Sequence, residues 1–308
     1  MRTPPRQPTL TLGLPTFGTA PAGGWRRVLE AARAADRAGI DRVVVSDHVV
    51  NGPDVASYPW GRFPTGPDGD WLEPLTMLTA IAAVTERVRL STGILIAPLR
   101  PAALLAKTVA TLDVLSEGRV DLGVGVGWQR AEYDALGADF ASRGRLLDDT
   151  VGACRALWSE LPATYSSADI SFTDTYCAPR PHQERLPVWF SGTLNERNLR
   201  RIVDLGDGWI PIMGSTPDDI RQGTQRLREA FEAAGRDVEG LAVQGTLAPV
   251  RGPDGTTDLE ATLAAARPLL DAGVTNLSIH ISGLDRGLAD PEGTCGRLVE
   301  AFRAVDRA

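Results

Sequence analysis

Two kinds of apolar segment alternate along the chain, and their spacing predicts strands and helices in turn. Continuous apolar runs of about 4–8 residues are typical of buried strands, whereas apolar positions recurring every three or four residues indicate one face of a helix. The predicted strands are 9–14, 41–46, 88–96, 119–126, 186–190, 208–212, 240–247 and 274–281. The predicted helices are 25–38, 72–86, 102–115, 129–137, 145–159, 194–205, 217–234, 258–272 and 293–306. Prolines interrupt residues 161–185, which we expect to be irregular.

This alternation predicts a closed (β/α)8 TIM barrel, with an open doubly wound sheet as the alternative. No hinge-like linker divides the 308 residues, so we expect a single domain over residues 1–308. Residues 51–70 form a long loop rich in Gly, Pro and Asp that carries Tyr58, Trp60 and Phe63. Loops of this length usually have a function.

Composition narrows the class of protein. The formal net charge of −7, with no dominant basic face, argues against a nucleic-acid partner. The 3 cysteines are odd in number and far apart, which predicts neither a disulfide framework nor a CxxC metal site. Three separated histidines make a poor metal-ligand set. The N-terminus lacks an apolar segment long enough for a signal peptide or membrane span, so we expect a cytoplasmic protein without a membrane partner.

Polar residues follow several predicted strands, where the active site of a barrel forms. These positions hold Asp47, His48, Trp128, Gln244 and His280. Because imidazole is the usual acid or base near neutral pH, we predict that His48 is catalytic. A structural histidine at a strand end is the alternative for His48, and a simple cap is the alternative for Asp47. His182, beside a proline in a loop, is interpreted as structural.

Small residues between the fifth strand and its helix make a candidate phosphate site. In Ser191-Gly192-Thr193, backbone N–H groups and the helix dipole would attract an anion. Arg197 and two further arginines lie on one face of the following helix and could add positive charge for an anionic ligand. The alternative is that they form an ordinary solvated helix face. The GVGVG run at 123–127 does not fit GxGxxG, so it is not a dinucleotide-binding fingerprint. The alternative for its glycines is that they thin a barrel strand so that its neighbours can pack.

With these residues in view, the chain resembles the luciferase-like family of flavin and deazaflavin enzymes, and within it the branch that uses coenzyme F420. The resemblance is carried by VVVSDHVV (43–50), by the stretch RLSTGILIAPLRPAALLAKTVATLDVLSEGRVDLGVGVGW (89–128), and by LPVWFSGT (186–193) with LGDGW (205–209). It extends from the first strand to the last helix. It implies a luciferase-like TIM barrel with insertion loops, assembled as a homodimer.

The resemblance also implies places for the cofactor. The family has a non-prolyl cis peptide bond in the third strand, which maps to Gly93-Ile94 here. This bond would lie behind the central ring of the cofactor. Asp47 and His48 would contact the ring edge, and residues 191–193 would hold the phosphate. The full cofactor set that we predict is Asp47, His48, Gly93, Ile94, Gly127, Ser191, Gly192, Thr193 and Arg197. A sugar-phosphate dehydrogenase branch has a glutamate where this chain has Trp128, so that chemistry is not expected.

We interpret the chain as an F420-dependent oxidoreductase that moves hydride between the deazaflavin and a small, apolar organic substrate. His48 would donate a proton or polarise a carbonyl, and Asp47 would fix its tautomer or bond the ring. Loop 51–70 would act as an apolar lid. The residues expected on the substrate side are Thr16, Trp60, Trp128, Gln244 and His280.

Two other functions stay open from the sequence. The first is an FMN-dependent two-component monooxygenase fed by a separate reductase; an F420 enzyme would instead rely on a dehydrogenase to recycle its cofactor. The second is a barrel that binds a ligand without turnover, as a sensor or carrier. Clustered acid and base candidates favour an enzyme.

Overall fold

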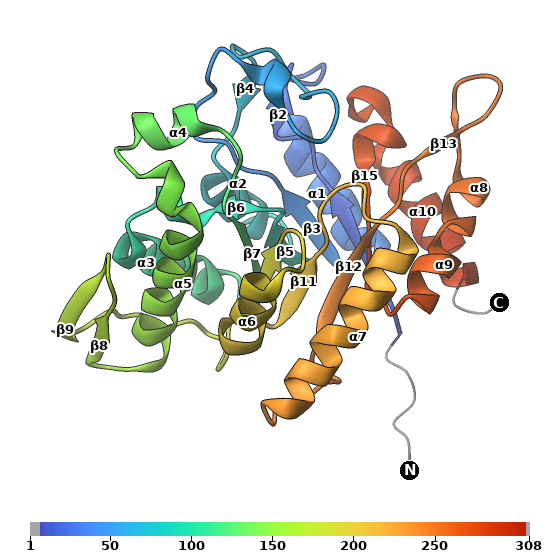
Figure 1. Cartoon of the computed structure of the whole chain (residues 1–308). Coiled ribbons are helices and arrows are strands. Elements are labelled where there is room, and N and C mark those ends of the chain that lie inside the picture. The colour runs from blue at the N-terminus through green and yellow to red at the C-terminus, as the bar shows by residue number, and fades with distance from the viewer. Residues whose placement is uncertain (1–6, 306–308) are drawn as a thin grey trace.

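The computed structural model describes residues 7–305, and its core is a closed barrel of parallel strands (Figure 1). Strands pair in the order β10–β11–β12–β15–β1–β3–β5–β7, and β10 also pairs with β7. That last pairing closes the ring, so the predicted (β/α)8 barrel is confirmed and the open sheet is excluded. The barrel strands are β1 (Thr9–Gly13), β3 (Arg42–Val45), β5 (Arg89–Thr92), β7 (Val120–Gly125), β10 (Val188–Ser191), β11 (Gly208–Ile210), β12 (Ala242–Thr246) and β15 (Asn276–His280).

Helices surround the barrel and bury their apolar faces against it. They are α1 (Arg26–Ala38), α2 (Pro74–Ala82), α3 (Ala102–Leu115), α4 (Arg130–Ala135), α5 (Arg143–Ser159), α6 (Glu196–Leu205), α7 (Pro217–Ala233), α8 (Leu259–Ala264), α9 (Ala266–Asp271) and α10 (Pro291–Val305). The helix expected over 258–272 is divided at Ala265, because Pro268 has no N–H to continue the helical hydrogen bonds. Within residues 7–305 every helix is too short or too polar to cross a membrane.

Short strands outside the barrel shape its two ends. β2 (Phe17–Gly18) pairs with β4 (Asp70–Trp71) and ties the end of the 51–70 loop to the carboxyl end of the barrel. At the same end, β6 (Leu95–Ile96) continues beside β7, and β13 (Val250–Arg251) pairs with β14 (Thr257–Asp258). Residues 161–185, expected to be irregular, contain a hairpin of β8 (Ala163–Ser166) and β9 (Ser171–Thr175) that stands away from the barrel (Figure 1).

The glycines of β7 let the third barrel strand approach closely. A Cβ at Gly123 would lie 2.1 Å from the backbone oxygen of Thr92, a distance that no side chain can tolerate. A Cβ at Gly125 would lie 2.8 Å from Ile94, and one at Gly127 would lie 3.0 Å from Ile96. Packing between strands therefore accounts for these glycines, as the strand-thinning alternative predicts, and the expected role of Gly127 in cofactor binding stays a prediction.

Gly123→Ala is expected to destabilise the protein by about 3 kcal/mol or more, because the clash is with backbone that cannot rotate away. Gly296→Ala is the matched control: it lies inside α10 with nothing within 4 Å of the new methyl group. That change should stabilise the fold by about 0.5–1 kcal/mol. Urea unfolding of both variants measures the difference, and equal midpoints would contradict the packing explanation.

An ionic cluster fills the amino-terminal half of the barrel interior. Arg42 on β3 and Arg89 on β5 both bond the Asp121 carboxylate on β7, with N–O distances of 2.7 and 2.6 Å. The Arg42 guanidinium also lies 4.6 Å from the centre of the Trp189 ring. Burial raises the pKa of Asp121, but the two guanidinium groups outweigh it and hold that pKa below its usual value. The carboxyl-terminal half of the barrel interior is therefore the half that is available for a ligand-binding site.

Candidate active site

His48 is held at the barrel mouth by a carboxylate from a distant segment. Its Nδ1 lies 2.9 Å from Oε2 of Glu132, and the other oxygen of Glu132 accepts from the Val49 backbone N–H, also at 2.9 Å. Glu132 lies in the first turn of α4 and is fully buried. Because both carboxylate oxygens accept, the proton of a neutral His48 is placed on Nδ1, and Nε2 is left for a ligand.

Aromatic rings surround His48. The centroid of the Trp71 ring lies 4.5 Å from that of the His48 ring, and the two ring planes meet at 86°. The ring centroids of Phe63 and Trp128 lie 5.3 and 6.3 Å from that of His48. Trp71 is itself stacked between Phe17 at 4.4 Å and Phe63 at 5.6 Å. Such a surrounding excludes water and strengthens any polar interaction made inside it.

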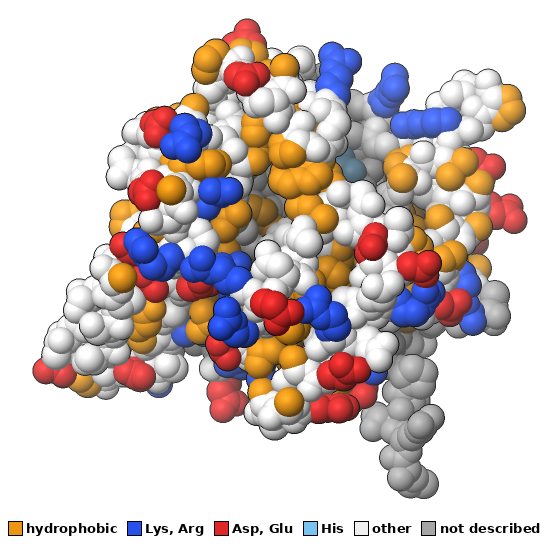
Figure 2. Space-filling model, viewed as in Figure 1, with side chains coloured by type: hydrophobic (Ala, Val, Ile, Leu, Met, Phe, Trp, Pro, Cys, Tyr) orange, Lys and Arg blue, Asp and Glu red, His pale blue; other side chains and the backbone are white. Residues whose placement is uncertain are grey.

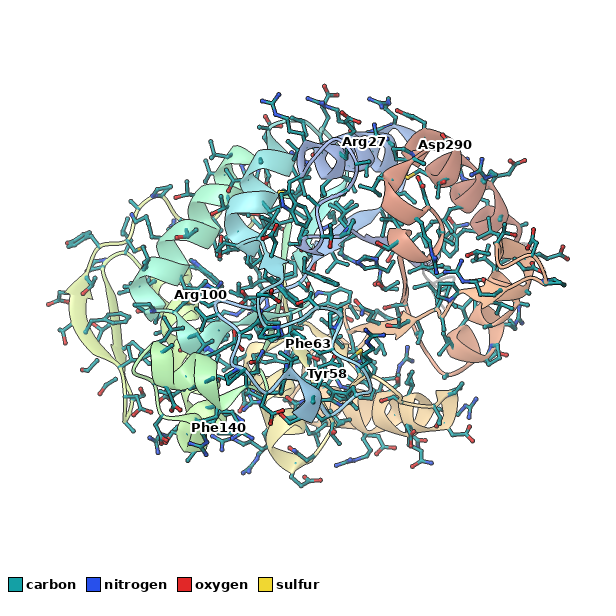
Figure 3. All side chains as sticks on the ribbon, turned by 90° about the horizontal axis from the view of Figure 1, so that it is seen from above. Arg27, Tyr58, Phe63, Arg100, Phe140 and Asp290 are labelled. Carbon is teal, nitrogen blue, oxygen red and sulfur yellow. The ribbon has the colours of Figure 1, made fainter. Side chains whose placement is uncertain are left out.

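The 51–70 loop supplies the roof of this cluster. Seen from above, Phe63 and Tyr58 lie over the middle of the barrel (Figure 3). The Tyr58 ring packs on Trp128 at 5.3 Å, and its hydroxyl reaches the sulfur of Met213, beyond β11, at 3.9 Å. Burial raises the pKa of Tyr58, which keeps the hydroxyl a hydrogen-bond donor. Trp60 stays at the rim, 39% exposed, with its ring 5.4 Å from that of Tyr58.

Asp47 does not orient His48. Its carboxylate accepts from both terminal nitrogens of Arg100, at 2.7 and 3.0 Å, and from the backbone N–H of Ile96 at 2.8 Å. The expectation that Asp47 fixes the His48 tautomer is corrected, because the structure gives the Nδ1 hydrogen bond to Glu132. Asp47 instead holds β6 and the start of the following helical turn in place.

The third barrel strand is interrupted where the resemblance implied a bulge. The Gly93–Ile94 peptide bond is cis, which confirms the expectation for this bond. β5 ends at Thr92 and β6 begins at Leu95, so these two residues lie between the strand segments. Gly93 is exposed at the mouth, where a Cβ would lie 2.6 Å from Val44. A flat surface without a side chain is thereby presented to the interior of the mouth.

The turn after β10 differs in detail from the predicted phosphate site. The Gly192 N–H is already bonded to the Ile210 carbonyl at 3.1 Å, so it is not free for an anion. Gly192 has φ of 121°, and the indole of Trp209 donates to its carbonyl. The exposed Thr193 lies two residues before Asn195, the residue that caps α6. Thr193 is therefore the exposed member of the turn, and Ser191 is half-buried.

Arg197 does not point its charge into that turn. Its Nε and Nη2 bond one oxygen of Asp148 on α5, at 3.1 and 2.8 Å, and Arg201 bonds the other oxygen. Figure 2 shows basic and acidic side chains interleaved over the face that carries α5, α6 and α7. Arg197 thus forms an ion pair between α5 and α6, in agreement with the solvated-face alternative, and its expected contact with the cofactor stays a prediction.

His280 and Gln244 lie on β15 and β12, two neighbouring strands of the barrel. The Nδ1 atom of His280 accepts from the Ser282 N–H at 3.3 Å, and burial lowers the pKa of His280 to about 4. The side chain is consequently neutral at physiological pH. Gln244 on β12 is half-buried and is paired in register with Asn276 on the neighbouring strand β15. Asn276 begins β15 and His280 ends it. Of these two residues, His280 lies nearer the mouth.

Buried polar atoms without a protein partner gather at this end of the barrel. Among residues 7–305 the buried, unbonded side-chain atoms include Thr16 Oγ1, Ser46 Oγ, Trp71 Nε1 and Trp128 Nε1. Trp71 and Trp128 flank His48, Ser46 lies two residues before it, and the Thr16 carbonyl accepts from the Leu72 N–H beside Trp71. Buried polar groups are normally bonded, so this concentration fits a ligand that supplies the missing partners.

Glu132, Trp71 and Arg100 are site residues that the sequence interpretation did not include. Glu132 had a usable signal, since it lies in the first helical turn after the fourth strand, at the end of the barrel where functional residues gather. The Trp71 position depends on the β2–β4 pairing, and Arg100 depends on where Asp47 points. Neither of these two has a local signal in the sequence.

Comparison with known proteins agrees with the architecture. The family model described as luciferase-like monooxygenase matches residues 9–275. The chain belongs to this family. Among curated relatives of this luciferase-like chain, "Uncharacterized protein Rv0953c" of Mycobacterium tuberculosis is 34% identical over 213 residues, which are 67% of this chain and 74% of that protein. The "F420-dependent glucose-6-phosphate dehydrogenase" of Segniliparus rotundus is 32% identical over 224 residues, 70% of this chain and 62% of that protein.

The fold is shared with a solved structure described as an F420-dependent secondary alcohol dehydrogenase in complex with an F420-acetone adduct. The TM-score is 0.76 at 18% identity, and the match covers 97% of this chain and 99% of that one. The resemblance in fold therefore extends over nearly the whole chain. The chain is thus a luciferase-like oxidoreductase by family, and its cofactor and substrate belong to the proposal below.

Proposed function

We propose that this luciferase-like protein is an F420-dependent oxidoreductase that transfers hydride between the deazaflavin and a small organic carbonyl compound or its alcohol. The observation that carries the proposal is the buried His48–Glu132 pair, set among aromatic rings at the barrel mouth. A 32%-identical relative is named for F420 dependence, which favours the deazaflavin over FMN.

The residues at the mouth fit a flat ring system. The exposed Gly93 and the half-buried Ile94 give a surface that a planar ring can lie against. The unbonded Ser46 hydroxyl provides a polar contact at the ring edge, and Thr193 at the head of α6 provides one for the phosphate. Asp47 and Arg100 hold this surface in place from behind, through the N–H of Ile96.

The chemistry assigned to the protein is proton transfer and positioning. When bound, the deazaflavin supplies a ring carbon that accepts or donates hydride. His48 then holds or releases a proton at Nε2, toward the substrate oxygen, while Glu132 stabilises the imidazolium through Nδ1. The Tyr58 and Phe63 rings keep water from that oxygen. His280, neutral with a pKa of about 4, is placed as a wall rather than as a proton donor.

Titration of the purified protein tests the cofactor. Quenching of F420 fluorescence with a much lower Kd than for FMN supports the proposal, and hydride transfer from reduced F420 to ketones then supports the reaction. The alternative is an FMN-dependent monooxygenase fed by a reductase, which the description of the matching family favours. Oxygen consumption with reduced FMN, together with preference for FMN in the titration, would replace the deazaflavin proposal.

Thr193→Glu is expected to weaken cofactor binding by about tenfold or more, since a carboxylate at this exposed turn repels the phosphate. Thr193→Gln is the matched control, with the same size and no charge, and should change Kd little. Both Kd values come from fluorescence titration at low salt. A Kd for Thr193→Glu that matches that of Thr193→Gln would place the phosphate elsewhere.

A further inference from the structure

We infer that the indole N–H groups of Trp71 and Trp128 bind the oxygen of an uncharged carbonyl substrate and thereby set specificity. The inference rests on the proposed function and names the substrate-recognition residues of the same site. Both Nε1 atoms are buried and lack a hydrogen-bond partner within the described chain. An indole nitrogen is a donor only, so the missing partner must be an acceptor.

Three other tryptophans differ from these two, because their indole N–H groups are bonded. The indole of Trp25 donates to Asp70 at 3.3 Å, that of Trp158 to the Ala106 carbonyl at 3.0 Å, and that of Trp209 to the Gly192 carbonyl at 2.9 Å. At these three positions the fold supplies an acceptor for the indole N–H. Among the described residues, the indole nitrogens that are both buried and unbonded belong to Trp71 and Trp128, which flank His48.

The geometry places both indoles around the proton-transfer residue. Their rings stand nearly perpendicular to His48, at 86° for Trp71 and 85° for Trp128, and both lie within 5.6 Å of Phe63. They are thus on the side of His48 that the 51–70 loop covers, whereas the exposed Gly93 surface lies on the third strand. An acceptor at the indoles is consequently assigned to the substrate and not to the cofactor ring.

Charge limits the class of substrate. Arg100, the guanidinium behind Asp47, is already bonded by the carboxylates of Asp47 and Glu73. The walls around His48 are the rings of Phe63, Trp71 and Trp128, which solvate an anion poorly. Neutral N–H donors in an apolar surrounding select a neutral acceptor. The class is therefore a ketone, enone or aldehyde with a flat apolar body.

Indole N–H resonances test the contact without any turnover. Protein labelled with ¹⁵N at tryptophan is recorded alone and with F420, and the two resonances are assigned from Trp71→Phe and Trp128→Phe. Acetone, cyclohexanone and 2-cyclohexenone are then added, with methylenecyclohexane as the analogue that lacks oxygen. We expect saturable downfield shifts of both N–H protons with at least one ketone and none with the hydrocarbon.

Three results would overturn the inference: no shift with any of the ketones, an equal shift with the hydrocarbon, or a shift produced by the cofactor that the ketones do not extend. Failure of the proposed function is read separately, as absence of F420 binding in the fluorescence titration. Since the ketone arm is also recorded on the protein alone, either result can occur without the other.

Kinetics separate recognition from structure. Trp71→Phe and Trp128→Phe keep an aromatic ring and should each lower kcat/KM for the ketone about tenfold, with the Kd of the cofactor and the Tm unchanged. Trp158→Phe is the control, because its indole is bonded to Ala106: it should lower Tm and leave kcat/KM unchanged. A fall in Tm for the first two variants with unchanged kcat/KM would assign them a structural role only.

Discussion

Replacing His48 with alanine is expected to lower kcat about 10²- to 10⁴-fold and to leave the Kd of the cofactor nearly unchanged. The imidazole is the acid or base placed at the mouth, and the hydride site loses its proton source when it is removed. Rapid mixing with reduced cofactor measures the rate of the hydride step, and added imidazole should restore part of it. Full turnover by a variant that binds cofactor normally would remove His48 from the mechanism.

Glu132→Gln tests how His48 is oriented. The amide can offer its NH₂ group to Nδ1, which would move the ring proton to Nε2 and invert the tautomer. It also removes the negative charge that stabilises an imidazolium. We expect a loss in kcat comparable to that of His48→Ala, and no further loss in the double variant, since the two residues act as a unit.

Glu196→Gln provides the matched control. It is the same chemical change on the surface, where the side chain is 77% exposed and pairs with Arg226. Its kcat should match that of the unmodified protein. Additive losses in the His48 and Glu132 double variant would show that Glu132 acts independently of the imidazole.

The His48–Glu132 pair shows which part of a site a single sequence can supply. His48 follows directly from the barrel alternation, because a polar residue just after a parallel strand must lie at the mouth. Its partner is 84 residues away along the chain. Which acid bonds the imidazole depends on how α4 is set against the second strand, and no local pattern contains that information. Asp47, the adjacent acid, was consequently the expected partner and is bonded to Arg100 instead.

The fold was predictable to the extent that periodicity determines it. Each of the eight barrel strands was expected near its observed place, since a strand buried on both faces gives a continuous apolar run. The β8–β9 hairpin was missed because its residues are mostly exposed and lack alternation. The β2–β4 pairing joins two-residue strands far apart in sequence, so neither is visible locally. That pairing positions Trp71, and the sequence interpretation missed this residue for the same reason.

Asp121→Asn is expected to destabilise the protein by about 3–5 kcal/mol, because it leaves two guanidinium groups in the barrel without a counter-charge. The Arg42 side chain is 10% exposed and the Arg89 side chain is 33% exposed. Solvent can therefore stabilise an unpaired charge on Arg89 better than one on Arg42. Asp218→Asn removes a carboxylate that is 77% exposed and pairs with Arg221 on the same helix. As the control it should cost less than about 1 kcal/mol.

The pH dependence of stability should identify the same carboxylate. The pKa of Asp121 is lowered in the folded protein from its usual 3.8, so its stabilisation is complete above pH 3.8. It is lost as the pH falls through the lower, folded pKa. Urea unfolding between pH 7 and pH 3 should show a decline at the acid end for the unmodified protein, and a smaller decline for Asp121→Asn.

A double variant separates the charge pair from simple loss of packing. Adding Arg42→Met to Asp121→Asn removes the more deeply buried of the two uncompensated cations and leaves Arg89, which reaches solvent. If unpaired charge is the cause, the double variant should be more stable than Asp121→Asn alone, with a coupling free energy of about 1–3 kcal/mol. If the two losses simply add, the Asp121 carboxylate contributes independently of the Arg42 charge, and the explanation by unpaired charge fails.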